Sequence, residues 1–292
     1  MTSAGIPDSS DMPEAEVREL LPNLRAALAW MRDYGDADGD GFLEYFDEAG
    51  TGLANQGWKD SGDSVRWRDG SLAEGPIALA EVQGYAHRAA LDGADLLEAF
   101  GGEPTADGMS RADEAAGWRE WAAGLAERFR AAFWLRDAVG PYPAIALDAE
   151  KRPVDSVTSN MGHLLASGLL DDGEMDAIVA RLTSPSMLSG YGIRTAASTE
   201  LAYHPLRYHV GSVWPHDTAM AIDGMLRAGY PEEAEKVARC VLRAAEAFHF
   251  RLPELFGGDS AADAPLPYPA ACRPQAWAAA SSVVVARALL GA

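Results

Sequence analysis

Two stretches decide the fold class of this chain: residues 74–100, EGPIALAEVQGYAHRAALDGADLLEAF, and residues 111–133, RADEAAGWREWAAGLAERFRAAF. In both, apolar side chains recur at the spacing that places them on one face of an α-helix. In the first these are Ile77, Ala80, Val82, Tyr85, Ala89, Leu96 and Leu97, and in the second Trp118, Trp121, Leu125 and Phe129. The short segment between the two stretches predicts an antiparallel pair of helices.

The same periodicity continues along most of the chain, which predicts an all-α fold. Further helices are expected at residues 14–34, 157–169, 172–183, 214–228, 231–248 and 274–290. Strand signals are few, and residues 142–147 carry the best of them. Short loops alternate with long loops that carry unusual residues, which favours a toroid of helical hairpins with a site at one mouth. Residues 1–13 are polar and predict a disordered lead-in, so one domain is expected over residues 14–292.

Composition excludes several classes of partner. The 292 residues are 48% hydrophobic and can bury a sizeable core. With 24 basic and 44 acidic residues, the net charge of -20 disfavours nucleic acid and anionic membranes. Cys240 and Cys272 are isolated and form neither a disulfide framework nor a metal spacing. The first residues lack a signal-peptide pattern and no window is apolar enough to span a membrane, so a cytoplasmic protein is expected.

The segment at residues 55–64, NQGWKDSGDS, has the chemistry of a sugar-binding loop. Trp58 offers an aromatic face for a sugar ring, and the polar neighbours offer hydrogen bonds to its hydroxyl groups. Asp60 has two interpretations: a general acid held against an aromatic wall, or a helix N-cap or Asx-turn residue. Asp63 follows a glycine and resembles a turn residue.

A second unusual acid lies in residues 251–258, RLPELFGG. Glu254 has apolar and helix-breaking neighbours, so it is either a buried catalytic carboxylate or a capping residue. Acids are rarely buried without a partner, which favours a functional role. Two carboxylates on separate loops are the minimum equipment for glycoside hydrolysis.

Residues 203–217, YHPLRYHVGSVWPHD, form a third dense cluster. Its histidines lie on irregular backbone and lack the i, i+4 pair with a glutamate that zinc helices use. Side chains that bind sugar hydroxyls at the start of a helix fit this cluster better than a zinc site. Residues 159–163, SNMGH, offer polar side chains at a helix mouth or a plain helix cap.

Residues 36–44, DADGDGFLE, resemble the first half of an EF-hand calcium loop. Asp36, Asp38 and Asp40 alternate before Gly41, but the twelfth position is Asp47 instead of a bidentate glutamate. The segment is either a structural calcium turn or an acidic turn without metal. No phosphate loop, nucleophile elbow or dinucleotide fingerprint is present, so no other cofactor is expected.

Several of these strings occur in one order in a known family. The chain resembles the C-terminal catalytic domain of bacterial glycogen-debranching, amylo-α-1,6-glucosidase-type proteins, which belong with the inverting glucosidases and trehalases of the (α/α)6-barrel class. The matching strings are DGDGFLEY at 38–45, NQGWKDS at 55–61, EVQGYA at 81–86, SN-x-GH at 159–163, YGIRT at 191–195, H-x-GSVWPHD at 209–217, LPELF at 252–256 and PQAW at 274–277.

The resemblance implies an (α/α)6 six-hairpin toroid that acts on α-glucosidic linkages of glycogen, α-glucans or oligosaccharides. It assigns Asp60 as general acid and Glu254 as general base. Expected contributors to substrate binding are Trp58, Lys59, Gln83, Asn160, His163, Tyr208, His209, Trp214 and His216. Because the family's barrel has about twelve helices, the chain is expected to lack the first helices of the ring. Such an open ring predicts a homo-oligomer or a complementing chain.

Two other interpretations remain open from the sequence. A histidine pair on a similar toroid could epimerise a sugar, and activity without Asp60 and Glu254 would favour that reaction. A catalytically silent or partner-dependent fragment would bind sugar without turning it over.

Overall fold

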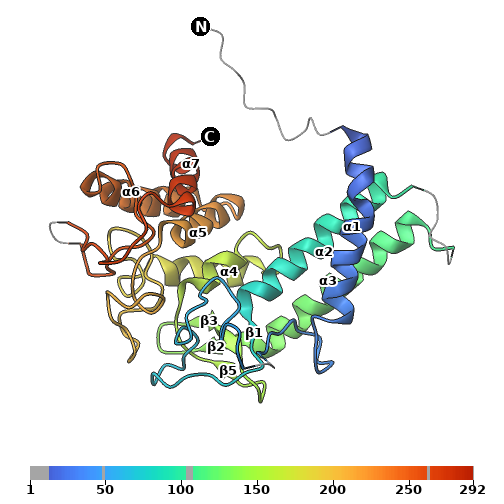
Figure 1. The fold of residues 1–292 in the computed structure, drawn as a ribbon, viewed down its shortest axis with the longest axis horizontal. Coiled ribbons are helices and arrows are strands. Elements are labelled where there is room, and N and C mark those ends of the chain that lie inside the picture. Colours follow the sequence, from blue (N-terminus) through green and yellow to red (C-terminus); the bar gives the residue numbers. More distant parts are fainter. Residues whose placement is uncertain (1–12, 48–49, 103–107, 262–263, 292) are drawn as a thin grey trace, which may run out of the picture.

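A computed structural model describes residues 13–47, 50–102, 108–261 and 264–291. The expected lead-in over residues 1–13 therefore lies, except for Pro13, outside the described residues. The chain is mostly helical, with 47% helix and few strands, and has the all-α fold that the sequence predicted, consistent with an (α/α)-type toroid. Figure 1 shows the helices arranged along an arc, with α1 (Glu14–Asp33) near one end and α7 (Ala276–Leu290) near the other.

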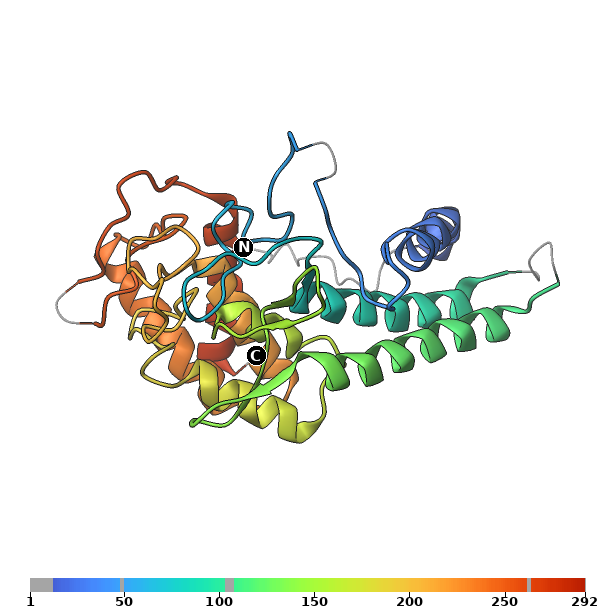
Figure 2. The same ribbon diagram turned by 90° about the horizontal axis from the view of Figure 1, so that it is seen from below.

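The first part of the arc is a long helical hairpin of α2 (Ala80–Phe100) and α3 (Arg111–Phe133). Figure 2 shows the two helices side by side over most of their length, with α1 against α2. Gly93 permits this contact, because a Cβ there would lie 2.8 Å from Leu28 of α1. Ser110 caps α3 by accepting a hydrogen bond from the backbone N–H of Asp113.

The strands are short and join the helical pairs at one side of the arc. β1 (Ala78–Leu79), β4 (Ala146–Leu147) and β5 (Pro153–Val154) form an antiparallel sheet in the order β1-β4-β5. β2 (Trp134–Arg136) pairs with β3 (Pro141–Pro143). The single strand expected at 142–147 is thus two strands. Because Ala78 and Leu79 pair with β4, α2 begins at residue 80, later than the expected 74.

The second part of the arc carries the shorter helices. They are η2 (Ser159–Leu164), α4 (Asp172–Leu182), α5 (Pro215–Arg227) and α6 (Pro231–Ala247), followed by α7. η2 is a single 3-10 segment where an α-helix was expected over 157–169. It packs against both α2 and α5, while α5 contacts α6 and α7. Close approach is possible because Gly162 of η2 faces Ala221 of α5, where a Cβ would lie 2.8 Å from that side chain.

The main core runs between the two parts of the arc, from α2 and α3 through η2 and α4 to α5, α6 and α7. Helix α1 joins a second cluster through Leu21 and Leu28, which are buried against α2 and α3. Its other side exposes Leu20 and Trp30, and Tyr34 is exposed directly after its last residue. Within the described residues, no helix is both long and apolar enough to cross a membrane.

Candidate active site

The acid loop, defined as residues 55–64, is anchored by its own buried polar groups. Asn55 Nδ2 donates to the carbonyl oxygen of Ser61 over 2.7 Å, and Ser64 Oγ donates to that of Lys59 over 2.5 Å. Asp60 itself is exposed. No helix begins after it, so the N-cap interpretation is wrong. Fixed backbone therefore presents this carboxyl group where a ligand can reach it.

Trp58 lies inside a cage of four rings. The ring of His163 stacks on it with a centroid distance of 5.8 Å and an interplanar angle of 11°. His209, Trp214 and His216 meet it edge-on at 5.5, 5.9 and 5.0 Å. Edge-to-face and offset-stacked arrangements of this kind fix a ring in one orientation. Trp58, two residues before Asp60, is thus held by side chains from η2, from α5 and from the segment before α5.

A buried polar chain supports the stacked histidine. His163 Nε2 donates to Asp217 Oδ1 over 2.8 Å, because a carboxylate can only accept. Its Nδ1 then accepts from the hydroxyl group of Tyr85. Burial tends to raise the pKa of Asp217, but the hydrogen bond from His163 and the positive charge of Lys59 lower it below its usual value. Asp217 therefore carries a negative charge inside the protein and fixes the tautomer of His163.

A second buried carboxyl group, Glu81, lies beneath the acid loop. Asn160 Nδ2 donates to its Oε1 over 2.8 Å, and burial raises the pKa of Glu81. Within the described residues, Glu81 Oε2 and Asp217 Oδ2 have no hydrogen-bond partner. Lys59, which is 3% exposed, lies within electrostatic reach of both acids. Burial lowers the pKa of Lys59 to about 8, although the charges of Asp217 and Glu81 work in the opposite direction.

His209 has one ring nitrogen bonded to the acid loop. The Ser61 hydroxyl group donates to Asp63 Oδ1, so His209 Nδ1 donates to Ser61 Oγ over 2.8 Å. Burial lowers the pKa of His209 to about 3, and burial likewise lowers that of His216 to about 4. Both rings are therefore neutral at neutral pH. Each can offer one donor and one acceptor to neighbouring groups, but neither carries a positive charge there.

Glu254 is half-buried and hydrogen-bonded at both oxygens. The Tyr208 hydroxyl group donates to Oε1 over 2.8 Å, and the backbone N–H of Cys272 donates to Oε2 over 3.1 Å. Its loop is joined to the segment before α5 by paired backbone hydrogen bonds between Val213 and Phe256. Trp214 Nε1 donates to the Tyr208 carbonyl oxygen, which fixes the tyrosine that holds Glu254.

Tyr208 contacts Glu254 directly and lies within electrostatic reach of Asp60. The pKa of Tyr208 is raised first by burial, then by its hydrogen bond to Glu254 and by the negative charges of Glu254 and Asp60. Two residues on distant loops thus act on one phenol group. The geometry expected of an inverting pair, with about 6.5–9.5 Å between the carboxyl groups, stays a prediction.

Gln83 occupies a different kind of position from the other expected sugar binders. Its Oε1 accepts from the Leu43 backbone N–H, and its Nε2 donates to the carbonyl oxygens of Leu43 and Leu79. It is fully buried. Because these contacts occupy its amide, Gln83 joins the 35–45 segment to α2, and we do not include it in the site proposed below.

A cavity of about 470 Å³ opens beside the cage and meets several predicted residues. It is lined by Trp58, Tyr85, His163, His216, Met220 and Trp277, among others. Lys59, Asn160 and His209 are at most 3% exposed, so they support the cavity wall from behind. Tyr208 and Trp214 lie on the Glu254 side of the cage, where their ring centroids are 4.8 Å apart.

Sequence reasoning missed four residues that hold this site: Glu81, Tyr85, Thr195 and Asp217. Glu81 had a usable signal, since it is an acid within the apolar run at the start of α2 and acids are rarely buried without a partner. Asp217 follows Trp-Pro-His at the start of α5, where an acid also fits the positive end of a helix. Thr195 acts mainly through its backbone, which no residue pattern announces.

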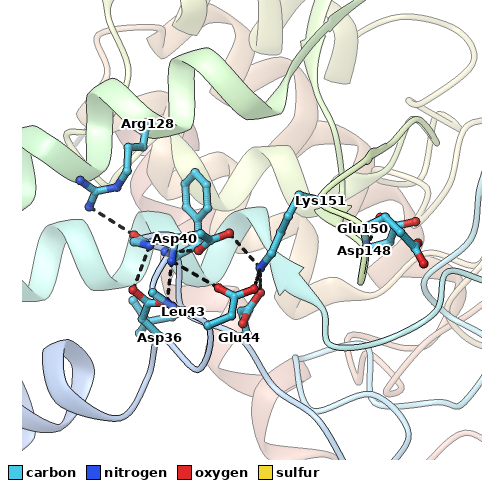
Figure 3. A network of polar contacts seen from close by, with 12 residues as sticks. Asp36, Asp40, Leu43, Glu44, Arg128, Asp148, Glu150 and Lys151 are labelled. Carbon is cyan, nitrogen blue, oxygen red and sulfur yellow. Dashed lines mark hydrogen bonds and ion pairs between the residues drawn. The ribbon is translucent and has the colours of Figure 1, made fainter.

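The acidic turn at residues 36–44 is built from backbone contacts and one lysine (Figure 3). The Asp36 carboxylate accepts from the backbone N–H groups of Gly39, Asp40 and Gly41. Lys151 Nζ lies 2.8 Å from both Asp38 Oδ2 and Asp40 Oδ2 and also contacts Glu44.

Burial alone would lower the pKa of Lys151, but the contacts with Asp38, Asp40 and Glu44 raise it above its usual value. Oxygens of Asp36, Asp38 and Asp40 lie within 4.8 Å of one another, a spacing that a metal ion could use. Calcium binding here stays a prediction, and the ammonium group already neutralises part of the cluster.

Comparison with solved structures shows the fold. Neutral trehalase Nth1 from Saccharomyces cerevisiae is similar with a TM-score of 0.57 and 16% identity, over 79% of this chain and 41% of that one. The GH63 mannosylglycerate hydrolase from Thermus thermophilus in complex with glucose has a TM-score of 0.64 and 18% identity, over 96% of this chain and 71% of that one. An uncharacterized conserved protein from the same organism gives 0.64 and 15%, over 96% and 74%.

No curated protein matches the chain. A family model does match residues 8–251, and it is described as the mannosylglycerate hydrolase MGH1-like glycoside hydrolase domain. The motifs predicted a glycosidase, which this match confirms, but it does not specify the glycogen-debranching type that they suggested. With more than half of its length matched, the chain belongs to the family of MGH1-like glycoside hydrolase domains.

Proposed function

We propose that this chain is an inverting glycosidase in which Asp60 is the general acid and Glu254 the general base. The observation that carries the proposal is a chain of contacts: Tyr208 donates a hydrogen bond to Glu254 and packs on Trp214, which packs on Trp58, two residues before Asp60. Asp60 protonates the leaving glycosidic oxygen. Glu254 takes a proton from a water molecule that attacks the opposite face of the sugar.

The environments of the two acids support this division of roles. Both oxygens of Glu254 serve as hydrogen-bond acceptors, for the Tyr208 hydroxyl group and for the Cys272 backbone N–H. A carboxylate is what a general base must be. Asp60 is exposed until a sugar covers it, and its loop places it two residues after Trp58. A ring stacked near that tryptophan would exclude water from the acid as it binds.

For the substrate we propose a glycoside with an α-glucosidic linkage. The similar solved structures are named a trehalase and a mannosylglycerate hydrolase, which supports a small glycoside over a polymer. Debranching of glycogen, suggested by the sequence motifs, is the second candidate. The cavity of about 470 Å³ beside Trp58 has room for a small glycoside, whereas a branched chain needs a longer groove.

The test measures sugar release from trehalose, glucosylglycerate, mannosylglycerate, isomaltose, maltose and glycogen. Proton NMR of the first product then gives its anomer, and an α-glucoside should release β-glucose. From glucosylglycerate, whose leaving group is not a sugar, release of α-glucose would contradict inversion. From trehalose, inversion gives one α- and one β-glucose because the leaving glucose keeps its configuration, so release of α-glucose alone would contradict it. Sugar binding without turnover of any compound would favour the silent fragment.

Substitution of the two acids tests their roles. Asp60→Asn and Glu254→Gln should each lower kcat by at least about 10³-fold, because each removes a proton-transfer group. Asp69→Asn and Glu246→Gln remove exposed acids outside the site and serve as matched controls with unchanged kcat. Retained activity in the double variant Asp60→Asn, Glu254→Gln would overturn the assignment and favour a different reaction, such as epimerisation.

A further inference from the structure

Lys59 is the neighbour of the proposed acid, yet its side chain is buried and contacts the protein backbone. Its Nζ donates to the carbonyl oxygen of Thr195 over 2.6 Å, and the residue is 3% exposed. Trp58 is its only described cation–π neighbour, at 5.1 Å from Nζ to the ring centroid. The ammonium group thus joins the acid loop to a segment 136 residues further along the chain.

Thr195 is the point where this link meets the other half of the site. Its N–H donates to the Ser212 carbonyl oxygen, and its hydroxyl group accepts from the Gly211 N–H. The Ser212 hydroxyl group in turn donates to the Tyr208 carbonyl oxygen over 2.6 Å. The connecting segment, defined as residues 207–214, is therefore tied to Lys59 through Thr195.

The connecting segment also holds the proposed base. Tyr208 donates its hydroxyl to Glu254, and Val213 exchanges two backbone hydrogen bonds with Phe256. A path of hydrogen bonds thus runs from the residue before Asp60 to the residue that binds Glu254. The contact between Ser61 and His209 is a parallel link between the same two parts.

The presence of a buried ammonium group at Lys59 needs a physical explanation. An ammonium group loses most of its hydration when buried, which costs several kcal/mol unless other charges and hydrogen bonds offset the loss. Here the carboxylate of Asp217 and the carboxyl group of Glu81 both act on Lys59, each with one oxygen that lacks a described hydrogen-bond partner. A buried cation is therefore retained beside two buried acids, and a methionine of similar length would avoid the cost of its burial.

We propose that Lys59 is a positioning residue, which fixes the acid loop relative to the connecting segment and so sets the placement of Asp60 against Glu254. This inference rests on the proposed function for its catalytic meaning. It differs from the expectation that Lys59 binds a sugar hydroxyl group. Displacement of a reacting group by about 1 Å can lower a rate by about 10²-fold, so a link of this kind has a measurable effect.

The test compares Lys59→Met with Lys236→Met, an exposed lysine on α6 that serves as the matched control. Lys59→Met should lower kcat by about 10²-fold and change KM by less than about threefold, since alignment and not binding is lost. Lys236→Met should change neither. A normal kcat in Lys59→Met would overturn the proposal. A raised KM with normal kcat would also overturn it, in favour of direct substrate binding.

A second readout does not depend on activity. In Lys59→Met, amide hydrogen exchange should become faster in both residues 57–64 and residues 209–214, while exchange in α6 stays unchanged. Unchanged exchange in residues 209–214 would overturn the proposed link even if the wild-type chain hydrolysed no glycoside. Failure of the proposed function and failure of this inference are thereby distinguished.

Variants that alter no charge cover the case in which Lys59→Met does not fold. Ser61→Ala removes the parallel link to His209, and Thr195→Val removes the hydroxyl group that Gly211 bonds. The double variant should lower kcat by more than the product of the single effects if the two links share the task of alignment. Strictly multiplicative effects, or none, would contradict a shared alignment role.

Discussion

Lys59 and Lys151 are two lysines beside acid-rich loops, and their surroundings shift their pKa values in opposite directions. Lys151 contacts three carboxylates while its side chain remains 29% exposed, and its pKa is raised. Lys59 is buried with a single described hydrogen bond from its ammonium group, to Thr195, and its pKa falls to about 8. Lys151 closes a structural turn. For Lys59, burial lowers the pKa, whereas Asp217 and Glu81 act to raise it. The lysine of one acid-rich loop therefore has direct carboxylate contacts, whereas the ammonium group of the other has a single backbone hydrogen bond.

Substitution of the two lysines should separate stability from turnover. Lys151→Met leaves Glu44, whose side chain is 2% exposed, without its cation, and should lower the free energy of unfolding by about 2 kcal/mol. The value is discounted because Lys151 and Asp38 are partly exposed. Turnover should stay near the wild-type value. Urea unfolding and kcat measured on one preparation check both, and a large loss of turnover in Lys151→Met would remove the contrast with Lys59.

Glu200 is an intermediate case that sharpens the comparison. It is 7% exposed, and Arg68 Nε approaches its Oε1 only to 3.6 Å. Burial raises the pKa of Glu200 to about 7, more than Arg68 lowers it. Since the folded pKa lies above the unfolded one, this group's contribution to stability is fully present below about pH 4.5. It is lost as the pH rises through 7.

Glu200→Gln should therefore stabilise the protein at pH 8 by about 1–2 kcal/mol and leave stability at pH 5 nearly unchanged. Arg68 keeps a partner in Asp137, so the substitution strands no cation. Thermal melting at the two pH values provides the measurement. Equal shifts at pH 5 and pH 8 would show that Glu200 does not titrate in this range.

Calcium should have the smallest effect. The turn of Asp36, Asp38 and Asp40 is expected to bind the ion, which would stabilise the folded state by mass action, by less than about 1 kcal/mol at millimolar calcium. In Lys151→Met the ion no longer competes with an ammonium group, so the increase in melting temperature over a chelator control should be larger. Identical melting curves in both proteins, with and without calcium, would show that the turn works without metal.

The sequence predicted helices well because their signal is local. Residues 111–133 were expected to be helical and match α3, with apolar side chains on one face and a serine cap before them. The prediction at 157–169 was wrong in type, since η2 is a short 3-10 segment wedged between α2 and α5. Its apolar residues are buried on several sides, so their spacing carries no helical period. Tertiary contacts decided its form.

Residues of the candidate site were likewise predictable only where their signal is local in the sequence. Trp58, Asp60 and Glu254 were recognisable because their residue types are unusual for their neighbourhood. Thr195 could not be found, since its contact with Lys59 uses a carbonyl oxygen, which every residue has. The partners of Lys59 also lie far away in sequence, so nothing in residues 55–64 indicates whether that lysine faces a sugar or the protein interior.

The long separations within the site have a consequence for biosynthesis. The links from Lys59 to Thr195 and from Ser61 to His209 span 136 and 148 residues. A ribosome that has made the acid loop must still translate for on the order of ten seconds before the connecting segment and Glu254 emerge. Until then the acid loop has its internal hydrogen bonds but lacks the links from Lys59 to Thr195 and from Ser61 to His209. With the proposed roles of Asp60 and Glu254, hydrolytic activity would therefore arise late during translation, and a chain that ends before residue 254 would be inactive.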